Sequence, residues 1–295
     1  MIKMYTYSII IPHYNSSKLL ERMLKSIPER EDIQVIVVDD CSKEEEVVNL
    51  KNLTHTNLEI YFQSSNHGAG AARNVGLEHV KGKWVIVVDA DDVFAPNAFD
   101  VFDKYKDCNI DYLCYCVKLL KEDGTRGRDI VSDISVRKYL KKQNQKTLSL
   151  FKYKNTVCWN KMVSSNFIRS NQIKFEDCEV NNDVLYNLMI GLKSTNFIVI
   201  PDELYYPIEV SNSITHKKRT IEREFLFYLQ AQKRNGFYEA IGLKQWPYYR
   251  YDFLYIPFMI KKHGLVGLID FLWYRKKHQL EIEKARSTYL AIITD

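Results

Sequence analysis

The sequence has few of the residues that mark fibrous, disulfide-stapled or membrane-spanning proteins. Its 295 residues include 11 glycines, 7 prolines and 6 cysteines, too few for a collagen-like or low-complexity chain. No apolar run approaches the roughly 18–20 residues of a membrane span. The N-terminus lacks a signal-peptide pattern, because its apolar run is short and no small-residue cleavage site follows. We therefore expect a cytoplasmic protein without membrane spans.

The cysteines do not have the spacing of a metal or disulfide site. Cys114 and Cys116 form a C-x-C pair, and no second pair follows at zinc-binding distance. Cytosolic thiols stay reduced. We therefore expect the cysteines to pack in the core.

Charge of one sign is also scarce. The sequence has 42 Lys and Arg against 37 Asp and Glu, a net charge of +5. A nucleic-acid-binding domain usually shows a strongly basic stripe, so we expect no nucleic-acid partner. Aromatic residues are plentiful instead: 20 Tyr and 14 Phe contribute to an aromatic fraction of 13%, and they gather towards the C-terminus.

Strands and helices are predicted to alternate over the first hundred residues. Short apolar runs rich in β-branched residues are typical of buried parallel strands; they span residues 8–11, 34–38, 58–62 and 84–88. Helices are predicted between them, at about 19–26 and 71–80. This alternation predicts an α/β fold with a mostly parallel sheet covered by helices on both faces.

Polar residues follow three of these strands. They are Pro12 to Asn15, Asp39–Asp40, and Asp89 to Asp92. In open α/β sheets, ligands bind outside the carboxyl ends of the strands, and carboxylates gathered there repel one another unless a cation is bound. Oxygen ligands of this kind suit Mg²⁺ or Mn²⁺. Each acidic pair alone could instead cap a helix or form a turn.

Four motifs carry a resemblance to a known family. In order they are Ser8 to Asn15 (SIIIPHYN), Val38 to Ser42 (VDDCS), Asn66 to Gly76 (NHGAGAARNVG) and Asp89 to Asp92 (DADD). Together they resemble the donor half of GT-A glycosyltransferases of family 2, although Cys41 stands where that family usually has Gly. Weaker matches continue to about Ile214. There Asn182 replaces the family's usual Glu, and an Arg of the closing segment is missing.

The resemblance implies a GT-A fold: a Rossmann-like, mostly parallel sheet flanked by helices, with a C-terminal helical extension. Residues 1–100 would form the half that binds the nucleotide-sugar donor. Residues 101–215 would form the half that binds the acceptor and carries the catalytic base. Residues 216–295 would form the aromatic and basic extension.

The resemblance also implies roles for single residues. The donor-binding set is Pro12, Tyr14, Asn15, Asp39, Asp40, Arg73, Asp89, Ala90 and Asp91. In it Tyr14 would stack on uracil, Asp40 would accept a hydrogen bond from the base, and Arg73 would contact the nucleotide. Asp91, with Asp89 and with His216 as a further candidate, would hold Mn²⁺ or Mg²⁺.

Asp183 is the candidate catalytic base. The apolar pattern after it places it at a helix N-terminus, where the helix dipole favours a charged carboxylate. Asp183 as a simple helix cap, and Asp177 as a rival base, are the alternatives. Trp159 and Lys161 are the candidate acceptor-binding residues, with Trp159 equally a candidate for a core aromatic.

The C-terminal segment combines aromatic and basic residues. Residues 219–235 are predicted to form an amphipathic helix with Ile221, Phe225, Tyr228 and Leu229 on one face. Residues 244–295 hold nine Lys and Arg against five Asp and Glu. Such a segment is typical of interfacial helices on anionic lipid, which would place the protein on the inner face of the plasma membrane. The alternative is a small helical domain or a homodimer interface.

The resemblance therefore implies an inverting glycosyltransferase. It would move a sugar from a UDP-hexose or UDP-N-acetylhexosamine to a hydroxyl of a growing surface glycan, such as capsule, lipopolysaccharide or a lipid-linked oligosaccharide. A sugar nucleotidyltransferase is the first alternative, but it needs a Gly-rich basic loop after the first strand, where this chain has Pro12 to Asn15. A non-catalytic glycan-binding relative is the second.

Overall fold

The computed structural model describes residues 4–209, 220–243 and 251–294. The chain divides into two compact units, Met1–Ser213 and Ile214–Asp295. His216, a candidate metal ligand, lies outside the described residues. The expected division of the first unit into donor and acceptor halves stays a prediction.

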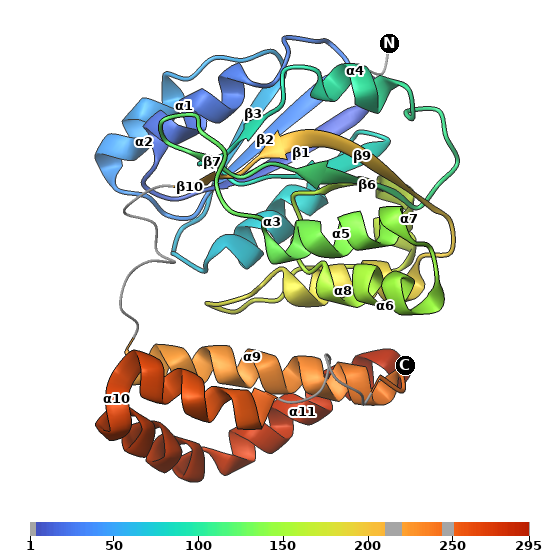
Figure 1. Ribbon diagram of the computed structural model, residues 1–295. Coiled ribbons are helices and arrows are strands. Elements are labelled where there is room, and N and C mark those ends of the chain that lie inside the picture. Colours follow the sequence, from blue (N-terminus) through green and yellow to red (C-terminus); the bar gives the residue numbers. More distant parts are fainter. Residues whose placement is uncertain (1–3, 210–219, 244–250, 295) are drawn as a thin grey trace. The chain divides into compact units, whose positions relative to one another are not determined.

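The first unit is built on an eight-stranded sheet with the order β3-β2-β1-β4-β8-β6-β9-β5 (Figure 1). The strands at one end of this order run parallel: β1 (Tyr7–His13), β2 (Ile33–Asp39), β3 (Leu58–Phe62) and β4 (Trp84–Val87). β8 (Lys161–Ser164) is antiparallel to both β4 and β6 (Tyr112–Val117). β9 (Phe197–Tyr206) is parallel to β6, and β5 (Val93–Phe94) is antiparallel to β9. β7 (Leu120–Lys121) and β10 (Ile208–Glu209) form a small second sheet.

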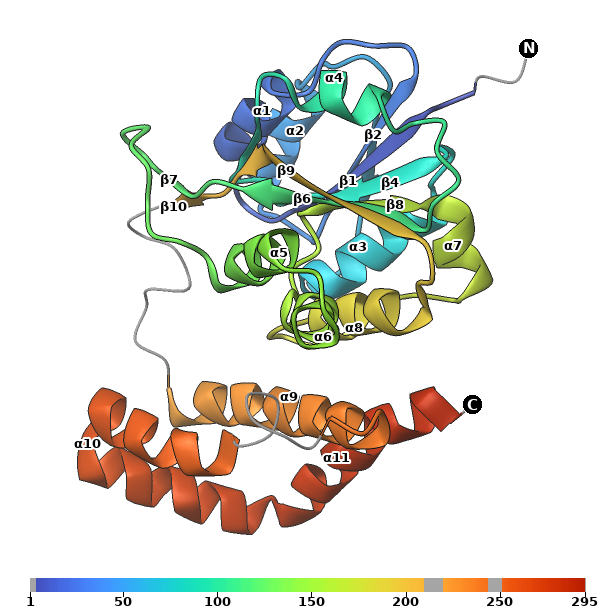
Figure 2. The same cartoon turned by 45° about the vertical axis from the view of Figure 1, so that its right-hand side comes forward.

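Helices cover both faces of the sheet, as predicted (Figure 2). One face carries α1 (Ser17–Lys25), α2 (Glu44–Lys51) and α4 (Ala98–Asp103). The other carries α3 (Ala69–Glu78), α5 (Val131–Lys141), α6 (Gln145–Lys154) and α8 (Val184–Lys193). A short helix, α7 (Ser165–Ser170), follows β8. The central strands β1, β2, β4 and β6 are buried on both faces. Cys114, Cys116 and Cys158 are buried, as expected for core cysteines, whereas Cys108 and Cys178 are partly buried and Cys41 is exposed, contrary to that expectation.

The strand register brings the polar segments together. His13 lies opposite Asp39 in the parallel pairing of β1 with β2, and Ile10 lies opposite Val87 in the pairing of β1 with β4. The segments after His13, Asp39 and Val87 therefore leave the sheet at the same edge, as the sequence predicted.

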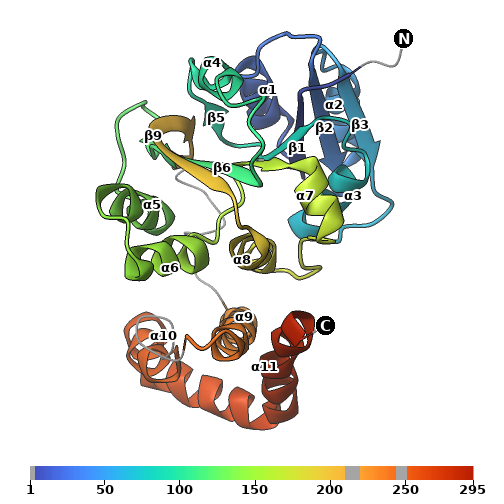
Figure 3. The ribbon, with the colours of Figure 1, turned by 90° about the vertical axis from the view of Figure 1, so that its right-hand side faces the viewer.

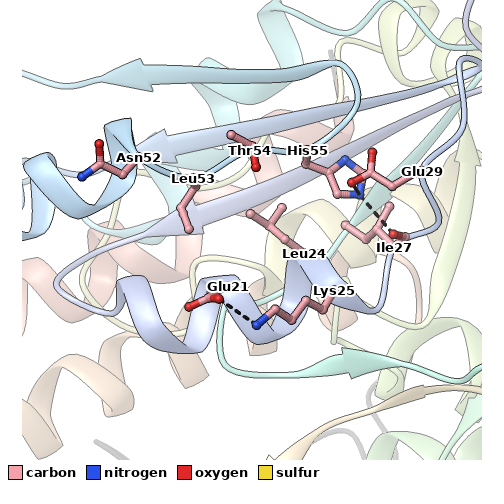
Figure 4. A pocket seen from close by; sticks show the side chains of 9 residues that line it. All are labelled: Glu21, Leu24, Lys25, Ile27, Glu29, Asn52, Leu53, Thr54 and His55. Carbon is pink, nitrogen blue, oxygen red and sulfur yellow. Dashed lines mark hydrogen bonds and ion pairs between the residues drawn. The ribbon is translucent and has the colours of Figure 1, made fainter.

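A pocket of about 410 Å³ lies at the opposite edge of the sheet. It is lined by the end of α1 and the loop before β3, and Figure 4 shows its side chains: Glu21, Leu24, Lys25, Ile27, Glu29, Asn52, Leu53, Thr54 and His55. His55 bonds through Nε2 to the carbonyl oxygen of Ile27 at 3.0 Å. This pocket is separate from the residues that the sequence singled out.

The second unit consists of α9 (Ile221–Ala240), α10 (Tyr251–Lys277) and α11 (Gln279–Thr294). α9 lies between the other two helices and packs against both (Figure 3). Their shared core is aromatic, with Phe225, Tyr228, Tyr255, Met259 and Phe271 buried. The predicted amphipathic helix is therefore confirmed, and part of the aromatic excess packs a helical domain. Within the described residues, no helix has the length and apolar character needed to cross a membrane.

Candidate active site

A buried hydrogen-bond network joins the ends of β1 and β2. The Ser16 N–H donates to Nε2 of His13 at 3.1 Å, which places the imidazole proton on Nδ1. His13 Nδ1 then donates to Asp39 Oδ1 at 2.8 Å. Asp39 also accepts bonds from the Ser42 hydroxyl and N–H. The network fixes the loop that carries Tyr14, whose ring is 53% exposed and free to stack on a planar ligand.

Asn15 ties this loop to the segment after β2. Its φ of 49° is in the left-handed region, which Asn tolerates better than most residues. Its N–H donates to the Ser42 hydroxyl at 2.8 Å, and its side-chain oxygen accepts from the Lys43 N–H at 2.9 Å. Asn15 is therefore a loop-fixing residue in this structure, and a direct donor contact from it stays a prediction.

Asp40 is held at the N-terminus of α3. Its carboxylate accepts bonds from the N–H groups of His67 and Gly68, at 2.8 and 2.7 Å, and from Gln63 Nε2 at 3.0 Å. The partial positive charge of a helix N-terminus stabilises such a carboxylate. Asp39 and Asp40 thus have their own partners within the protein, so charge repulsion at this edge concerns the three later carboxylates.

The turn from Asp89 to Asp92 is fixed from β9. The Tyr205 hydroxyl donates to Asp92 Oδ2 at 2.7 Å and accepts from the Asp89 N–H at 3.0 Å. The Ile208 N–H donates to the other Asp92 oxygen at 2.8 Å. Arg22 donates to the carbonyl oxygen of Asp91. Asp92 is therefore buried and structural, whereas Asp89 and Asp91 remain partly exposed.

The acidic turn carries unfavourable charge of its own. Burial, and next the charge of Asp89, raise the pKa of Asp91 to about 6. Burial and the charges of Asp91 and Asp89 likewise raise the pKa of Asp92. A divalent cation would relieve this repulsion, and one or two carboxylates plus substrate phosphates are the usual ligands of Mg²⁺. The described part of the chain has no group of three or more His, Cys, Asp or Glu placed to hold a metal, so substrate oxygens would have to complete the site.

Arg73 bridges the acidic turn and the segment of the candidate base. Its guanidinium is buried and bonds to Asp89 Oδ1 and to Asn182 Oδ1, each at 2.6 Å. It also lies 5.4 Å from the ring centre of Phe175. In this structure Arg73 joins Asp89 with Asn182, and its contact with the nucleotide stays a prediction.

A close seam between α3 and residues 175–182 supports that bridge. Asn74 makes two bonds to the backbone of Phe175: its side-chain oxygen accepts from the N–H at 2.8 Å, and its amide donates to the carbonyl at 2.9 Å. A Cβ at Gly70 would collide with the carbonyl oxygen of Glu176 and lie 2.8 Å from Cβ of Asn182. The Gly at position 70 thus permits the backbone approach that puts Asp183 beside Asp89.

Asp183 immediately precedes α8, as predicted. It occupies the N-cap position of α8, but its side chain makes no capping hydrogen bond, so its carboxylate is not used to cap the helix. Burial raises its pKa to about 6, Arg73 lowers it, and Asp89 raises it further. The helix dipole therefore does not set the direction of the shift, because burial outweighs it. A carboxylate with this pKa is ionised above about pH 6 and is a stronger base than a solvated Asp.

Lys161 is not placed to bind an acceptor, contrary to the prediction. Its ammonium is 4% exposed and donates to Val157 O at 2.8 Å, Asn160 Oδ1 at 2.9 Å and Asn187 Oδ1 at 2.8 Å. Burial lowers its pKa to about 8. Lys161 therefore holds the loop before β8 against α8.

Trp159 lies partly buried against the main core. Its ring is nearly parallel to that of Tyr205, with centroids 5.6 Å apart. The structure therefore shows the core contact of Trp159, and acceptor binding by its partly exposed remainder stays a prediction.

The sequence reasoning missed three residues that shape the site. His13 and Asn74 appeared only as letters within motifs, and Tyr205 was not singled out at all. Their partners lie 26 to 116 residues away in sequence. A signal for His13 was present, because its register partner in adjacent parallel strands is an Asp.

Comparison with known proteins agrees with this geometry. The profile described as Glycosyl transferase family 2 matches residues 8–163, which is more than half of the chain. The chain belongs to glycosyl transferase family 2. The match covers the strand ends, the α3 motif and the acidic turn described above.

Relatives of this family 2 chain act in the synthesis of bacterial surface polymers. It is 27% identical over 210 residues to the poly(ribitol-phosphate) beta-N-acetylglucosaminyltransferase TarS of Staphylococcus aureus, an alignment of 69% of this chain and 35% of TarS. It is 25% identical over 221 residues to the minor teichoic acid biosynthesis protein GgaB of Bacillus subtilis, covering 71% of this chain and 24% of GgaB. The chain thus spans about a third or less of the length of these relatives.

A solved structure shows the same fold. The structure of S. aureus TarS 1–349 in complex with UDP-GlcNAc has a TM-score of 0.62 and 18% sequence identity, and the comparison covers 97% of this chain and 81% of that one. The predicted GT-A type of architecture, with a curled, mostly parallel sheet and C-terminal helices, is confirmed.

Proposed function

We propose that this family 2 chain is an inverting glycosyltransferase that moves a sugar from a UDP-sugar to a hydroxyl of a bacterial surface glycan. The observation that carries the proposal is the Arg73 bridge, which sets the carboxylates of Asp89 and Asp183 in one site. One of these carboxylates belongs to the donor motif and the other begins α8. The family match and the relatives' roles point to the same reaction.

The nucleotide base of the donor would lie against Tyr14, whose loop is fixed by the His13–Asp39–Ser42 hydrogen-bond network. A stacked pyrimidine needs an exposed aromatic ring, and Tyr14 is exposed. The resemblance puts Pro12 and Asp40 beside the base and Ala90 in the backbone next to the ribose. UDP-GlcNAc is the first donor to test, because the TarS relative was solved with it.

Asp91 and Asp89 would hold Mn²⁺ or Mg²⁺ together with the diphosphate. Such a cation acts as a Lewis acid that stabilises the charge developing on the leaving diphosphate. The raised pKa of Asp91 fits this role, since the carboxylate pair has more charge than the protein itself neutralises. His216 remains a candidate ligand outside the described residues.

Asp183 would act as the general base. It takes the proton from the acceptor hydroxyl while the hydroxyl oxygen bonds to the anomeric carbon, and the bond from that carbon to the phosphate oxygen breaks with its electrons passing to the diphosphate. This single displacement inverts the anomeric centre. General base catalysis typically contributes 10²–10⁴-fold. Arg73 would hold Asp183 and the acidic turn in a fixed position relative to each other through its bonds to Asn182 and Asp89.

The acceptor would be a hydroxyl-rich polymer. The relatives act on poly(ribitol phosphate) or in teichoic acid synthesis, so a polyol-phosphate chain is the first acceptor class to test. Capsule and lipopolysaccharide rest on the sequence resemblance alone. A sugar nucleotidyltransferase gains no support from the relatives, which are glycosyltransferases or polymer-synthesis proteins.

The test is a panel of nucleotide-sugars with the purified full chain, Mn²⁺ or Mg²⁺, and poly(ribitol phosphate) fragments. We expect one UDP-sugar to raise the melting temperature and to be consumed in a metal-dependent way. Asp183→Asn should keep donor binding and lose transfer by at least about 10²-fold. Asp91→Asn should lose the metal dependence together with transfer.

Asp177→Asn is the matched control. Asp177 is exposed, lies in the same segment and was the rival base, so this change should leave transfer unaltered. Equal activity of Asp183→Asn and the wild-type protein would contradict the proposed base. Stabilisation by no UDP-sugar, but by another nucleotide-sugar, would correct the donor and leave the mechanism standing.

A further inference from the structure

The second half of α10 presents an exposed apolar face. Leu265, Val266, Ile269, Leu272 and Trp273 are 67%, 72%, 64%, 41% and 62% exposed. Their spacing of i, i+1, i+4, i+7 and i+8 puts all five on one side of a helix. Contiguous apolar surface of this kind marks an interaction site more often than scattered exposed residues do. We call these five residues the α10 face.

The orientation of the α10 face is fixed by the opposite side of the same helix. Phe271 is buried in the aromatic core of the second unit, and Leu268 and Tyr274 pack against that core. Arg275 lies over the ring of Tyr228 in α9, 4.7 Å from its centre. The α10 face therefore cannot turn inward without breaking these contacts.

Gly264 separates this half of α10 from the first half. Its φ of 73° and ψ of −174° interrupt the helix, and such a φ is favourable mainly for glycine. The first half is held by Glu224 of α9, which is fully buried and bonds to Lys262 at 2.6 Å. The two halves thus have separate anchors, and only the second presents the α10 face.

Cations surround the α10 face. Lys276 is exposed and follows Ile269 by seven residues and Leu272 by four, so it lies within the face. Lys277 is exposed at its margin, with its ammonium 5.4 Å from the ring centre of Trp273. Lys261 is exposed on the first half, whereas Asp270 is the acidic residue of the second half. Apolar and aromatic side chains beside lysines are the composition of helices that lie in a membrane interface.

We propose that the α10 face docks onto an anionic lipid surface, with its apolar side chains at headgroup depth and Lys276 and Lys277 on lipid phosphates. The charge pattern favours lipid over a second copy of the chain. A two-fold symmetric contact places the same patch on both subunits. It would bring each Lys276 against the lysines of its partner, in a contact made of the same apolar side chains. An anionic surface instead neutralises these lysines.

The test is co-sedimentation of the full chain with vesicles of phosphatidylcholine mixed with the anionic lipid phosphatidylglycerol. We expect the wild-type chain to bind these vesicles more tightly than pure phosphatidylcholine and to be released by salt. Val266→Glu should weaken binding by at least about tenfold, and Lys276→Ala by about fivefold.

Val131→Glu is the matched control. Val131 is 73% exposed and Val266 is 72% exposed, and both are helical valines, so the two substitutions make the same chemical change. Val131 lies in α5 of the first unit, and its variant should bind vesicles like the wild-type chain. Circular dichroism and hydrolysis of the UDP-sugar should be unchanged in both variants, because neither residue touches the core or the site.

Three results would overturn the proposal. The wild-type chain, folded and active, could fail to bind anionic vesicles; Val266→Glu could bind them as well as Val131→Glu does; or sedimentation could show a dimer that Val266→Glu dissociates, with no vesicle binding. The last result would assign the α10 face to self-association. None of these results bears on the catalytic role proposed for Asp183. Likewise, the effect of an Asp183 variant on sugar transfer does not test membrane binding by the α10 face.

Discussion

Replacing Asp183 by asparagine should stabilise the protein while it abolishes sugar transfer. The carboxyl of Asp183 makes no capping bond to α8, so an amide of the same shape loses no contact with that helix. What the change removes is a charge held in a buried position. The pKa of that carboxyl rises from 3.8 to about 6, burial being the largest cause.

The magnitude follows from the raised pKa. Between pH 3.8 and about 6 the folded state holds a proton on Asp183 that the unfolded state has released, so stability falls as the pH rises through this window. The full cost, at most about 3 kcal/mol at ~1.36 kcal/mol for each pKa unit, is present at pH 7. For a unit of this size, that amounts to roughly 6–12 °C in melting temperature.

The assay is thermal unfolding of the wild-type chain, Asp183→Asn and the exposed control Asp177→Asn, at pH 7.5 and at pH 4, without donor or metal. Asp183→Asn should melt higher at pH 7.5 and close to the wild type at pH 4, and the control should follow the wild type at both. An equal gain at both pH values would mean that charge is not the cause. No gain at pH 7.5 would refute the reasoning from burial.

Three further substitutions test the scaffold of the site. Arg73→Ala should lower kcat and shift the acid limb of the pH–rate profile to higher pH, because Arg73 lowers the pKa of Asp183. An acid limb at the same pH would show that Arg73 does not influence the ionisation of Asp183. Gly70→Ala should cost about 1–3 kcal/mol in denaturant unfolding, since the added methyl meets a backbone oxygen, and an unchanged midpoint would mean that the seam relaxes freely. Tyr205→Phe should cost about 1–3 kcal/mol, because buried Asp92 loses its hydroxyl donor, and should raise the metal concentration needed for half-maximal activity; a destabilised variant with an unchanged metal requirement would limit Tyr205 to a structural role.

The parallel part of the fold was readable from sequence because its strands are short, apolar and buried on both faces. β1, β2 and β4 lack polar side chains that face water, so their hydrophobic runs have no competing interpretation. β9 begins with an apolar run from Phe197 to Ile200, but most of that run is only partly buried. β9 includes exposed Pro201 and Asp202, and β8 is four residues long, so their pairing depends on partners distant in sequence.

The sequence predicted the site residues that belong to a motif. It did not predict the residues whose role depends on whether they are buried in the folded protein. Asp89 and Asp91 follow the end of a strand, and the family resemblance marks them and Asp183 as functional candidates. Lys161 resembled a ligand-facing cation, but Asn160, Asn187 and a backbone carbonyl form a buried cage around its ammonium. Neither that cage nor the direction of the Asp183 pKa shift follows from local sequence, because both depend on how α8 packs.

The two bonds from Asn74 to Phe175 join positions that are 101 residues apart. During synthesis, the first hundred residues leave the ribosome well before residues 175–183 exist, and elongation at about 5–20 residues per second separates the two events by seconds. A nascent chain can therefore pair its parallel strands while Asp183 and the residues that fix the acidic turn, Tyr205 and Ile208, are still missing. Neither the acidic turn nor the candidate base can reach its final position before these later segments have docked, which delays turnover until residues 175–183 lie against α3.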